Sequence, residues 1–340
     1  MPLTPIAGVT RLRAFQLGKE TTFRTAVAAT RRMPWTVTPT VDPHWTNPTA
    51  DTGTLDQAIA PYKTAVDITA AATGQLFSND VPTLISAGLQ GNLSLTGAGA
   101  AKTFATTIAS TSQDVFDTYT GEWFDDASAD AFQYTGGVIS DFSLDYPQDL
   151  GPINLTANWR FAKVVYPGTP TAGLTVDTSP VPLYAADTFF AVNDTAGAIG
   201  TTQLTSQVYG LTISVNNNLD IKRFANGNST RFQVDNYGRG ERVVDFTVTF
   251  AKATAAIAES VKWIADSPTE RFAEIITSST VEAQAGIAHQ LRIRIPGYWF
   301  TRTETAINTN TGFQLMGHQV YDTTLGYPIQ FRSISARTTL

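Results

Sequence analysis

Three histidines, His44, His289 and His318, are the side chains of this sequence best suited to acid–base or metal chemistry. None of them stands at a metal-ligand spacing from another, and none lies near a motif that would supply a nucleophile. Cysteine is absent, which excludes thiolate metal sites, disulfides and a cysteine nucleophile. We therefore expect structural or surface histidines rather than a catalytic centre.

The segment Gly97–Thr103 (GAGAAKT) is the nearest approach to a phosphate-binding loop. A P-loop requires glycine where this sequence has Thr96 and Ala101, and no helix follows the segment. The expected structure is a flexible turn, and neither a nucleotide nor another cofactor is expected.

Two further clusters have a chemical interpretation and a structural one. Asp125, Asp126 and Asp130 are acidic, but calcium needs additional oxygen ligands at fixed spacing and a turn glycine, and the next glycine is Gly136. A solvated loop is expected there, with a weak cation site as the alternative. The aromatic run Tyr298–Phe300 could be a platform for a sugar or a base, but we expect a buried strand end or a subunit contact.

The charge of the chain argues against nucleic-acid binding. Residues 1–168 carry 10 Lys and Arg against 15 Asp and Glu, and residues 169–340 carry 13 against 14. A protein that grips phosphates carries a basic surplus instead. The sequence also lacks a secretory signal pattern and the ~20 consecutive apolar residues of a membrane span. We expect a chain that is made in a cytoplasm and stays soluble or joins an assembly.

Apolar and polar residues alternate with period two in several segments, which predicts β-strands with one face on a core. The clearest are Ile153–Phe161, Leu211–Val215, Val244–Phe250 and Leu291–Ile295. Two segments are predicted to be helical: Asp80–Gly88 with Asp80 as N-cap, and Thr254–Ala265 with Thr254 as N-cap. The predicted fold class is mainly β.

Short matches recur between the two halves of the chain at nearly constant offsets. Val66–Thr69 matches Val244–Thr247, and Tyr119–Trp123 matches Leu291–Ile295. Leu150–Gly151 matches Leu325–Gly326, and an alternating strand follows each match, at Ile153–Phe161 and at Ile329–Ile334. The matches predict a tandem duplication, with domain 1 at residues 1–168 (including an extended arm at 1–10) and domain 2 at 169–340. The length of 340 residues suits two domains.

Each half contains a long polar excursion, at His44–Tyr62 and at Asp220–Arg242. Loops of this length inside compact domains usually have a task. The Asn226–Gly227 turn signal suggests that each excursion is a long hairpin leaving the domain body. In the second excursion arginines alternate with acidic residues, which favours a salt-bridged interface over a DNA-binding track.

Stretches in order across nearly the whole chain carry a family resemblance: Gly18–Phe23, Thr64–Thr69, Asp149–Pro152, Trp159–Phe161, Asp220–Gly227 and Pro296–Arg302. Together they resemble the tail tube (major tail) proteins of long-tailed, non-contractile bacteriophages, in their two-domain form. The resemblance implies two tandem β-sandwich or barrel domains, each with a flanking α-helix and a long β-hairpin. The hairpins would contribute to a β-barrel that lines a central channel.

The resemblance also implies a structural role without catalysis. Rings of three two-domain chains, with approximate sixfold symmetry, would stack into a tube through which DNA is ejected into the host. The expected partners are further copies of the chain, a tape-measure protein, tail terminator and baseplate proteins, and double-stranded DNA that passes without sequence-specific binding. The protein would be made in the host cytoplasm and reside in the virion tail, with no membrane partner and no cofactor.

Within the excursions, aromatic and charged residues are the candidates for assembly or for the channel wall. They are Trp45, Asp51, Asp56, Tyr62, Asp220, Arg223, Phe224, Arg231, Arg239 and Arg242. Asp51 and Asp56 are expected on the channel wall, and Arg223 and Arg239 are expected to bridge to acidic groups of the next subunit. The alternative function is a carbohydrate-binding or adhesin-like β-sandwich module of a phage baseplate, followed by a β-rich hydrolase.

Overall fold

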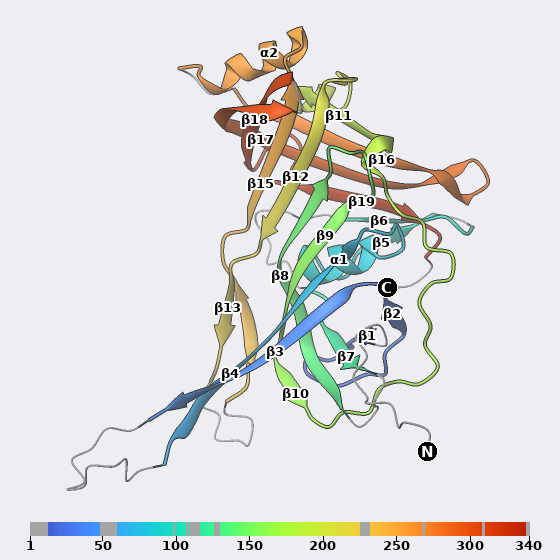
Figure 1. Cartoon of the computed structure of the whole chain (residues 1–340), viewed down its shortest axis with the longest axis vertical. Coiled ribbons are helices and arrows are strands. Elements are labelled where there is room, and N and C mark those ends of the chain that lie inside the picture. Colours follow the sequence, from blue (N-terminus) through green and yellow to red (C-terminus); the bar gives the residue numbers. More distant parts are fainter. Residues whose placement is uncertain are drawn as a thin grey trace, which may run out of the picture.

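The computed structural model describes residues 13–47, 60–97, 99–106, 108, 116–125, 130–224, 232–266, 269–307 and 310–337. Several expectations fall outside these residues: the arm at 1–10, Asp51, Asp56, Asp126, the Asn226–Gly227 turn and Arg231. Figure 1 shows a β-rich, elongated molecule with two hairpins that leave the body in the same direction.

The described elements of the first half follow one another along the chain as strands with one helix among them. They are β1 (Ala14–Lys19), β2 (Arg31–Met33), β3 (Thr36–Thr46), β4 (Tyr62–Gln75), α1 (Val81–Gly88), β5 (Ser94–Thr96), β6 (Lys102–Ala105), β7 (Tyr119–Phe124), β8 (Ala131–Tyr146), β9 (Asn154–Phe161) and β10 (Lys163–Val165).

The described elements of the second half are again strands with one α-helix among them, together with short 3₁₀ turns. They are η2 (Ala185–Asp187), β11 (Thr188–Asn193), η3 (Ala196–Ala198), β12 (Val208–Asn216), β13 (Leu219–Lys222), β14 (Asn236–Arg239), β15 (Val243–Ala251), α2 (Thr254–Ser260), η4 (Val261–Trp263), β16 (Arg271–Gln284), β17 (Ile287–Ile307), β18 (Asn310–Gln319) and β19 (Gln330–Ser335). The predicted class, mainly β, is confirmed.

Six strands of each half are connected in the same antiparallel order. In the first half the order is β1-β7-β8-β9-β4-β3. In the second half it is β11-β16-β17-β18-β15-β12. A helix follows the corresponding strand in each half, α1 after β4 and α2 after β15. Each half also has one long strand, β8 or β17, that changes partner along its length.

The strand order corrects two of the expected matches between the halves. Tyr119–Trp123 lies on β7, whose counterpart in the order is β16, whereas Leu291–Ile295 lies on β17. Ile153–Phe161 includes β9, whose counterpart is β18, whereas Ile329–Ile334 includes β19. Period-two alternation looks alike in any half-buried strand, so it fixes which face is buried but not which partner the strand takes.

The two halves are joined by direct strand pairing. β12 pairs with the second part of β8, from Leu211 opposite Tyr146 to Asn216 opposite Asp141, and β6 pairs with β19. The first joint produces one continuous antiparallel sheet of eight strands, in the order β3-β4-β9-β8-β12-β15-β18-β17. A single buried apolar cluster extends through both halves, from Phe15 to Phe331.

Both helices form close to where they were expected, and Asp80 is the N-cap residue of α1 as predicted, whereas the N-cap of α2 differs from the prediction. Asp80 precedes α1 without capping it through its side chain, since its carboxylate pairs with Arg31 at 2.5 Å. Ala253, not Thr254, is the N-cap of α2, and the helix continues only to Ser260 before a 3₁₀ turn.

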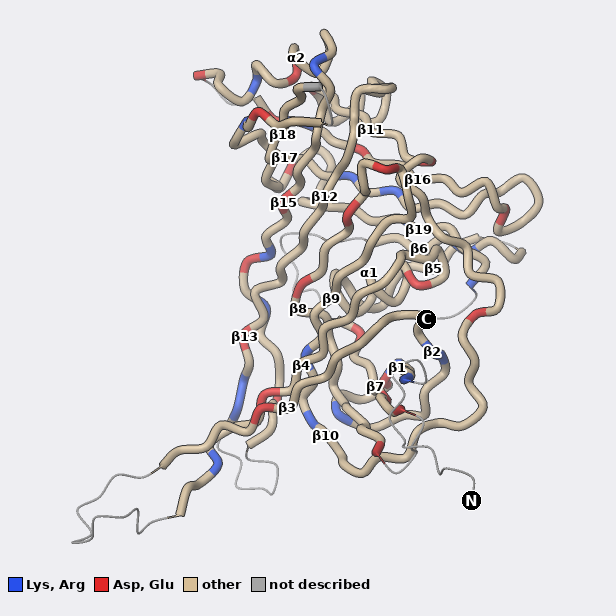
Figure 2. The backbone as a smooth tube through the Cα atoms, in the orientation of Figure 1, with Lys and Arg blue, Asp and Glu red and all other residues tan. Residues whose placement is uncertain are grey.

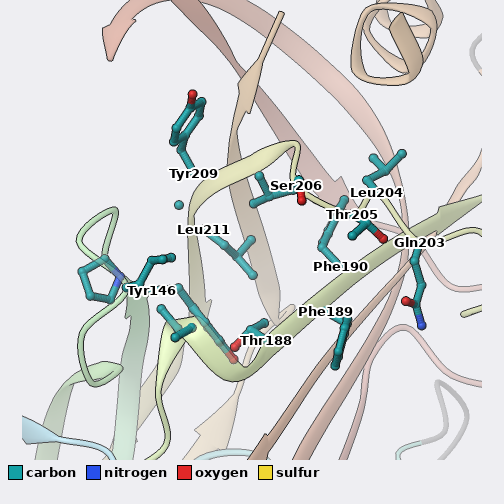
Figure 3. Close-up of a pocket in the computed structure, with 16 residues that line it drawn as sticks. Tyr146, Thr188, Phe189, Phe190, Gln203, Leu204, Thr205, Ser206, Tyr209 and Leu211 are labelled. Carbon is teal, nitrogen blue, oxygen red and sulfur yellow. The ribbon is translucent and has the colours of Figure 1, made fainter. Parts of the chain in front are cut away.

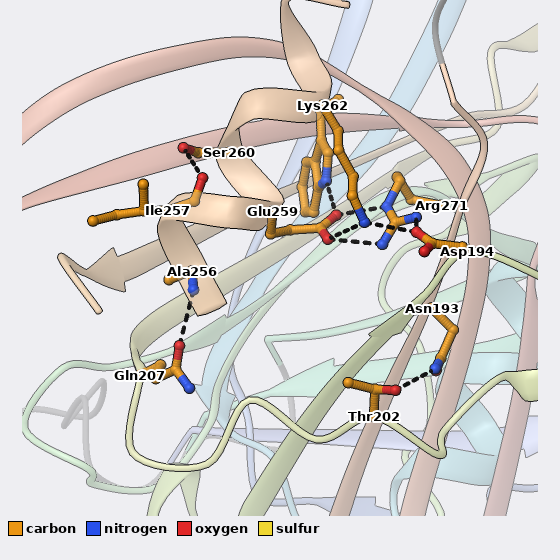
Figure 4. Close-up of polar contacts among 11 residues, drawn as sticks. Asn193, Asp194, Thr202, Gln207, Ala256, Ile257, Glu259, Ser260, Lys262 and Arg271 are labelled. Carbon is orange, nitrogen blue, oxygen red and sulfur yellow. Dashed lines mark hydrogen bonds and ion pairs between the residues drawn. The ribbon is translucent and has the colours of Figure 1, made fainter. Parts of the chain in front are cut away.

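α2 is fastened to the body by an ion-pair cluster on its inner side. Glu259 accepts two hydrogen bonds from Arg271, at 2.6 and 2.7 Å, and one from the indole N–H of Trp299 at 2.6 Å (Figure 4). Lys262 contacts the same carboxylate at 3.2 Å. Removing one member of a buried pair of this kind typically costs about 3–5 kcal/mol, so the cluster holds α2 in a defined position.

Candidate assembly surfaces and channel face

The two polar excursions are hairpins, as expected. β3 and β4 pair from Thr36 opposite Thr73 to Thr46 opposite Tyr62, with an irregularity at His44 and Trp45. β13 and β14 pair from Leu219 to Lys222. The second hairpin continues β12 and β15, so both hairpins extend strands of the eight-stranded sheet beyond the body (Figure 1).

The hairpins contact each other within one chain, and this corrects the expected role of Arg223. Its guanidinium binds the carboxylate of Asp67 at 2.5 Å and the carbonyl oxygen of Val66 at 3.2 Å. Val66 in turn donates its backbone N–H to Phe232 at 2.8 Å. An acidic partner of Arg223 therefore lies on the first hairpin of the same chain.

Three aromatic candidates of the hairpins are exposed to solvent. Trp45 is 59% exposed, Tyr62 54% and Phe224 58%. Large exposed apolar side chains that gather on projecting elements mark interaction surfaces. Asp220 is exposed as well and is paired with Lys222 on the same strand.

Arg242 was expected on the second excursion but is 5% exposed at the base of the hairpin. Its guanidinium donates to Asn217 Oδ1 at 3.1 Å and to the carbonyl oxygen of Leu89, just after α1, at 2.6 Å. Asn217 donates to the carbonyl oxygen of Gly88 at 2.7 Å. A cation at these last carbonyls is favourable, so Arg242 joins the halves. Arg239 lies on β14 opposite Leu219.

One face of the eight-stranded sheet lies on the core and the other is polar. The core face carries side chains such as Phe142, Leu155, Ile213 and Phe246, all at most 2% exposed. The polar face is formed mainly by Thr, Ser, Asn and Asp, in register across the strands: Thr36, Thr38, Thr40, Asp42, Thr69, Thr73, Asn154, Thr156, Asn158, Asp141, Ser143, Asp145, Thr212, Ser214, Asn216, Asp245, Thr247, Gln314 and His318.

The ionised side chains of this polar face are predominantly acidic. Its aspartates are Asp42, Asp67, Asp141, Asp145 and Asp245, and its cations along the same strands are Arg160 and Lys63. In Figure 2 acidic segments (red) recur along the strands of this sheet and where the β3–β4 hairpin leaves the body.

The aspartates at the middle of this face are held by neutral groups. Asn158 donates to Asp141 at 2.5 Å, and Thr212 donates to Asp145 at 3.0 Å. Their charge is therefore not cancelled by these partners. Sequence reasoning missed these residues, although the alternation that placed Asp245 between Val244 and Phe246 had already put it on the face opposite the core.

Each of the three histidines lies beside a polar side chain. His44 lies 3.0 Å from Asp67, and His318 lies 2.7 Å from Asp245. His289 is buried, and its Nδ1 lies 2.8 Å from the hydroxyl of Ser78. Burial lowers the pKa of His289, which favours the neutral imidazole. Among the described residues no three His, Asp or Glu side chains form a group that could hold a metal ion.

A pocket of about 230 Å³ lies beside the joint between the halves (Figure 3). Its lining includes Tyr146 and Leu211, the outermost pair of the β8–β12 joint, together with Phe189 and Tyr209. Within the described part of the chain the lining has apolar, hydroxyl and amide side chains but no ionisable acid or base other than tyrosine. It therefore offers no general acid–base pair.

The neighbouring residues of the aromatic run Tyr298–Phe300 differ in exposure. Trp299 of the aromatic run is 5% exposed, whereas Phe300 is 59% exposed. No helix in the described part of the chain is long and apolar enough to cross a membrane.

Comparison with known proteins identifies the family. No curated protein matches the chain. The family model described as phage tail tube protein matches residues 10–311, which is most of the sequence and includes both hairpins and every strand of the eight-stranded sheet except β18, of which it covers only the start. The chain therefore belongs to the phage tail tube protein family and is a structural component of the phage tail that assembles with other subunits into a tube.

Proposed function

We propose that three chains form a closed ring with approximate sixfold symmetry, and that stacked rings enclose the channel through which DNA is ejected into the host. The observation that carries this proposal is the eight-stranded sheet. It consists of two four-strand units in the same order, β3-β4-β9-β8 and β12-β15-β18-β17. At its outer edges, β3 and the Thr301–Ile307 part of β17 each have one strand partner in the described residues.

Three such sheets contain enough strands for a wide barrel. Twenty-four strands, spaced about 4.8 Å apart and tilted by about 40°, give a barrel ~48 Å across between backbones. Interfaces that repeat head to tail close into a ring when the rotation between subunits fits. The two halves of each chain would then occupy alternating positions, and we assign them to residues 1–168 and 169–340.

In this arrangement the polar face of the sheet lines the channel. Its aspartates Asp141, Asp145 and Asp245 repel the phosphates of passing DNA, and its neutral Thr, Ser and Asn side chains offer no strong phosphate ligand. The apolar face stays on the core of each subunit. A wall of this composition favours passage without sequence-specific binding.

The hairpins are assembly elements in this proposal. Trp45, Tyr62 and Phe224 are exposed on them and would be covered by neighbouring subunits. The tube would form around a tape-measure protein, end at tail terminator and baseplate proteins, and reside in the virion after synthesis in the host cytoplasm. The chain would act by assembly alone and not as an enzyme.

Electron microscopy of the purified protein in negative stain tests the proposal. We expect concentration-dependent assembly into hollow tubes of constant width. A protein that stays monomeric at every concentration, and whose isolated monomer binds oligosaccharides, would favour the carbohydrate-binding alternative instead.

A further inference from the structure

We propose that β3 of one chain pairs antiparallel with the open edge of β17 in the next chain, in the register in which β12 pairs with β8 inside each chain. Trp45, which follows that edge, then covers the apolar outer face of α2. This inference rests on the proposed ring of chains and specifies its subunit joint.

The open edges of β3 and β17 correspond to the two strands, β12 and β8, that pair with each other inside the chain. β12 pairs with β15 on one side and with β8 on the other. Its counterpart β3 pairs only with β4 in the described residues. The second part of β8 pairs with both β9 and β12, whereas the corresponding part of β17, from Thr301 to Ile307, pairs only with β18 in the described chain. The first half thus has an open edge on β3, and the second half has an open edge on β17.

The pairings inside the two halves fix the register of the new joint. Pro43 lies opposite Val66 as Val215 lies opposite Val244, which aligns β3 with β12. Aligning β9 with β18 in the same way places Thr305 at the position of Ser143. Inside the chain Ser214 faces Ser143. The equivalent pair between chains is Asp42 with Thr305, and the next pair of the same orientation is His44 with Thr303.

Two prolines reduce the number of N–H donors at the open edge of β3. Val66 gives its N–H to Phe232 and not to β3, so Pro43 opposite it points its backbone toward the open edge, as does Pro39 four residues before. Prolines at an edge remove N–H donors and limit pairing with arbitrary strands. The joint between chains keeps the N–H of Val41 and the carbonyls of Pro39, Val41 and Pro43. It has fewer hydrogen bonds than the internal joint, so side-chain contacts must contribute more.

The helices supply that side-chain contact. All eight residues of α1 are buried, and its last carbonyls are bonded by Asn217 and Arg242 from the base of the second hairpin. α2 exposes Ile257 (44%), and the 3₁₀ turn that continues it exposes Val261 (59%) and, at its end, Ile264 (65%), although the Glu259 cluster holds the helix firmly. In Figure 4 Ile257 lies on the side of the helix away from that cluster. The second half therefore has a helix that is held in a defined position and whose apolar outer face is exposed to solvent.

Trp45 is the residue placed to provide that cover. It stands two positions after Pro43, as Asn217 stands two positions after Val215. Asn217 contacts the end of α1 inside the chain, and Trp45 of a neighbouring chain would reach the end of α2 in the same way. An exposed tryptophan thus meets exposed aliphatic side chains, and both are removed from water on assembly.

Disulfide cross-linking tests the joint. Because the chain has no cysteine, only the introduced cysteines can form disulfides. Asp42→Cys and Thr305→Cys are introduced together, tubes are assembled in reductant, and the tubes are then oxidised. We expect covalent trimers on a denaturing gel without reductant, reverting to monomers with it. Ser143→Cys with Ser214→Cys is the positive control, which should close within the chain and give no oligomer.

A matched control tests the register. Thr40→Cys with Thr303→Cys displaces one partner by four residues, roughly 13 Å along the strand, beyond disulfide reach, and should yield at least tenfold less trimer. Should the first pair impair assembly in reductant, His44→Cys with Thr303→Cys provides the same test. Tubes that form and oxidise without trimers, or that cross-link equally in the displaced control, would overturn the joint but leave the tube function standing. A parent chain that forms no tubes would overturn both.

Discussion

α1 and α2 occupy the same place in the strand order of their halves but differ in what covers them. α1 is sealed on all sides, in part by Asn217, Arg242 and Arg337 from the second half. α2 is held on one side by Glu259, whereas Ile257 of the helix and Val261 and Ile264 of the turn that continues it are exposed to solvent. The helix of the first half is thus covered within one chain, whereas the exposed side of α2 would be covered only by another copy.

The strand edges show the same difference. β8 is saturated on both sides by β9 and β12, whereas Thr301–Ile307 of β17 has one neighbour among the described strands. An open edge is normally a liability for a soluble protein. In a subunit of a closed ring it becomes the joining surface, so changes at β8 should affect folding and equivalent changes at β17 should affect assembly.

A proline at the open edge should have the largest effect. Ala306 corresponds to Leu144 of the saturated strand, and its N–H points toward the open edge by the same alternation. Ala306→Pro should abolish tube formation while leaving the thermal midpoint of the monomer within a few degrees, as measured by electron microscopy and circular dichroism. Ala306→Ser should assemble normally. Leu144→Pro should prevent folding. Tube formation by Ala306→Pro would show that the open edge of β17 is not needed for assembly.

Charged substitutions on the two helices should separate folding from assembly. Ile85 on α1 is fully buried, so Ile85→Asp should cost at least ~4 kcal/mol of unfolding free energy. Ile264, just beyond α2, is 65% exposed, so Ile264→Asp should change monomer stability by less than ~0.5 kcal/mol. The same change should raise the protein concentration needed for assembly at least tenfold, with Ile264→Leu as the neutral control. Equal effects of both aspartates on monomer stability would contradict the account.

The pH dependence of stability should also distinguish α1, the fully buried helix, from α2. Burial raises the pKa of Asp80, which precedes α1, from 3.8 to about 6, although Arg31 and Arg337 oppose the shift. The folded state therefore favours the protonated carboxyl. The stability associated with Asp80 is fully present below pH ~4 and is lost as the pH rises through about 6.

Comparison with Asp80→Asn isolates this effect. The stability of the parent relative to the variant should fall by about 2.4 kcal/mol between pH 4 and 7, as measured by chemical denaturation at each pH. A difference that stays constant, or that grows with pH, would show that the buried carboxyl is not destabilised in its ionised form.

Charge reversal on the polar face should have the smallest effect, on DNA retention rather than on assembly. Asp145→Lys should give tubes that retain duplex DNA in a salt-dependent manner, because each lysine that contacts a phosphate adds about 0.9 to the slope of log K against log salt. Glu282→Lys makes the same charge change near the end of β16, a strand outside the eight-stranded sheet, and should not retain DNA. Equal retention by both variants would place the polar face outside the channel.

The sequence predicted strands and helices better than it predicted partners. Alternation placed Val244–Phe250 and Leu211–Val215 in strands correctly, because burial of one face imposes period two. The same pattern could not reveal that β12 pairs with β8, since pairing between distant segments depends on the whole fold. Arg242 was expected at a surface because arginine is rarely buried unpaired, but Asn217 and the Leu89 carbonyl satisfy it inside.

The candidate site was predicted in outline only. The hairpins and their exposed aromatic residues Trp45 and Tyr62 followed from the length and polarity of the excursions. The aspartates of the polar face were missed because Asp141, Asp145 and Asp245 come from three strands that only pairing brings onto one surface.

The rotational symmetry of the tube tests the central claim most directly, namely that the two halves of one chain are successive members of one ring. Averaged cryo-electron microscopy images of tube cross-sections, combined with mass per unit length, give the number of chains in each ring. We expect three chains, with threefold symmetry and an approximate sixfold repeat, and the polar face of the eight-stranded sheet toward the channel. Six chains in each ring, with one half of every chain outside the wall, would contradict the account.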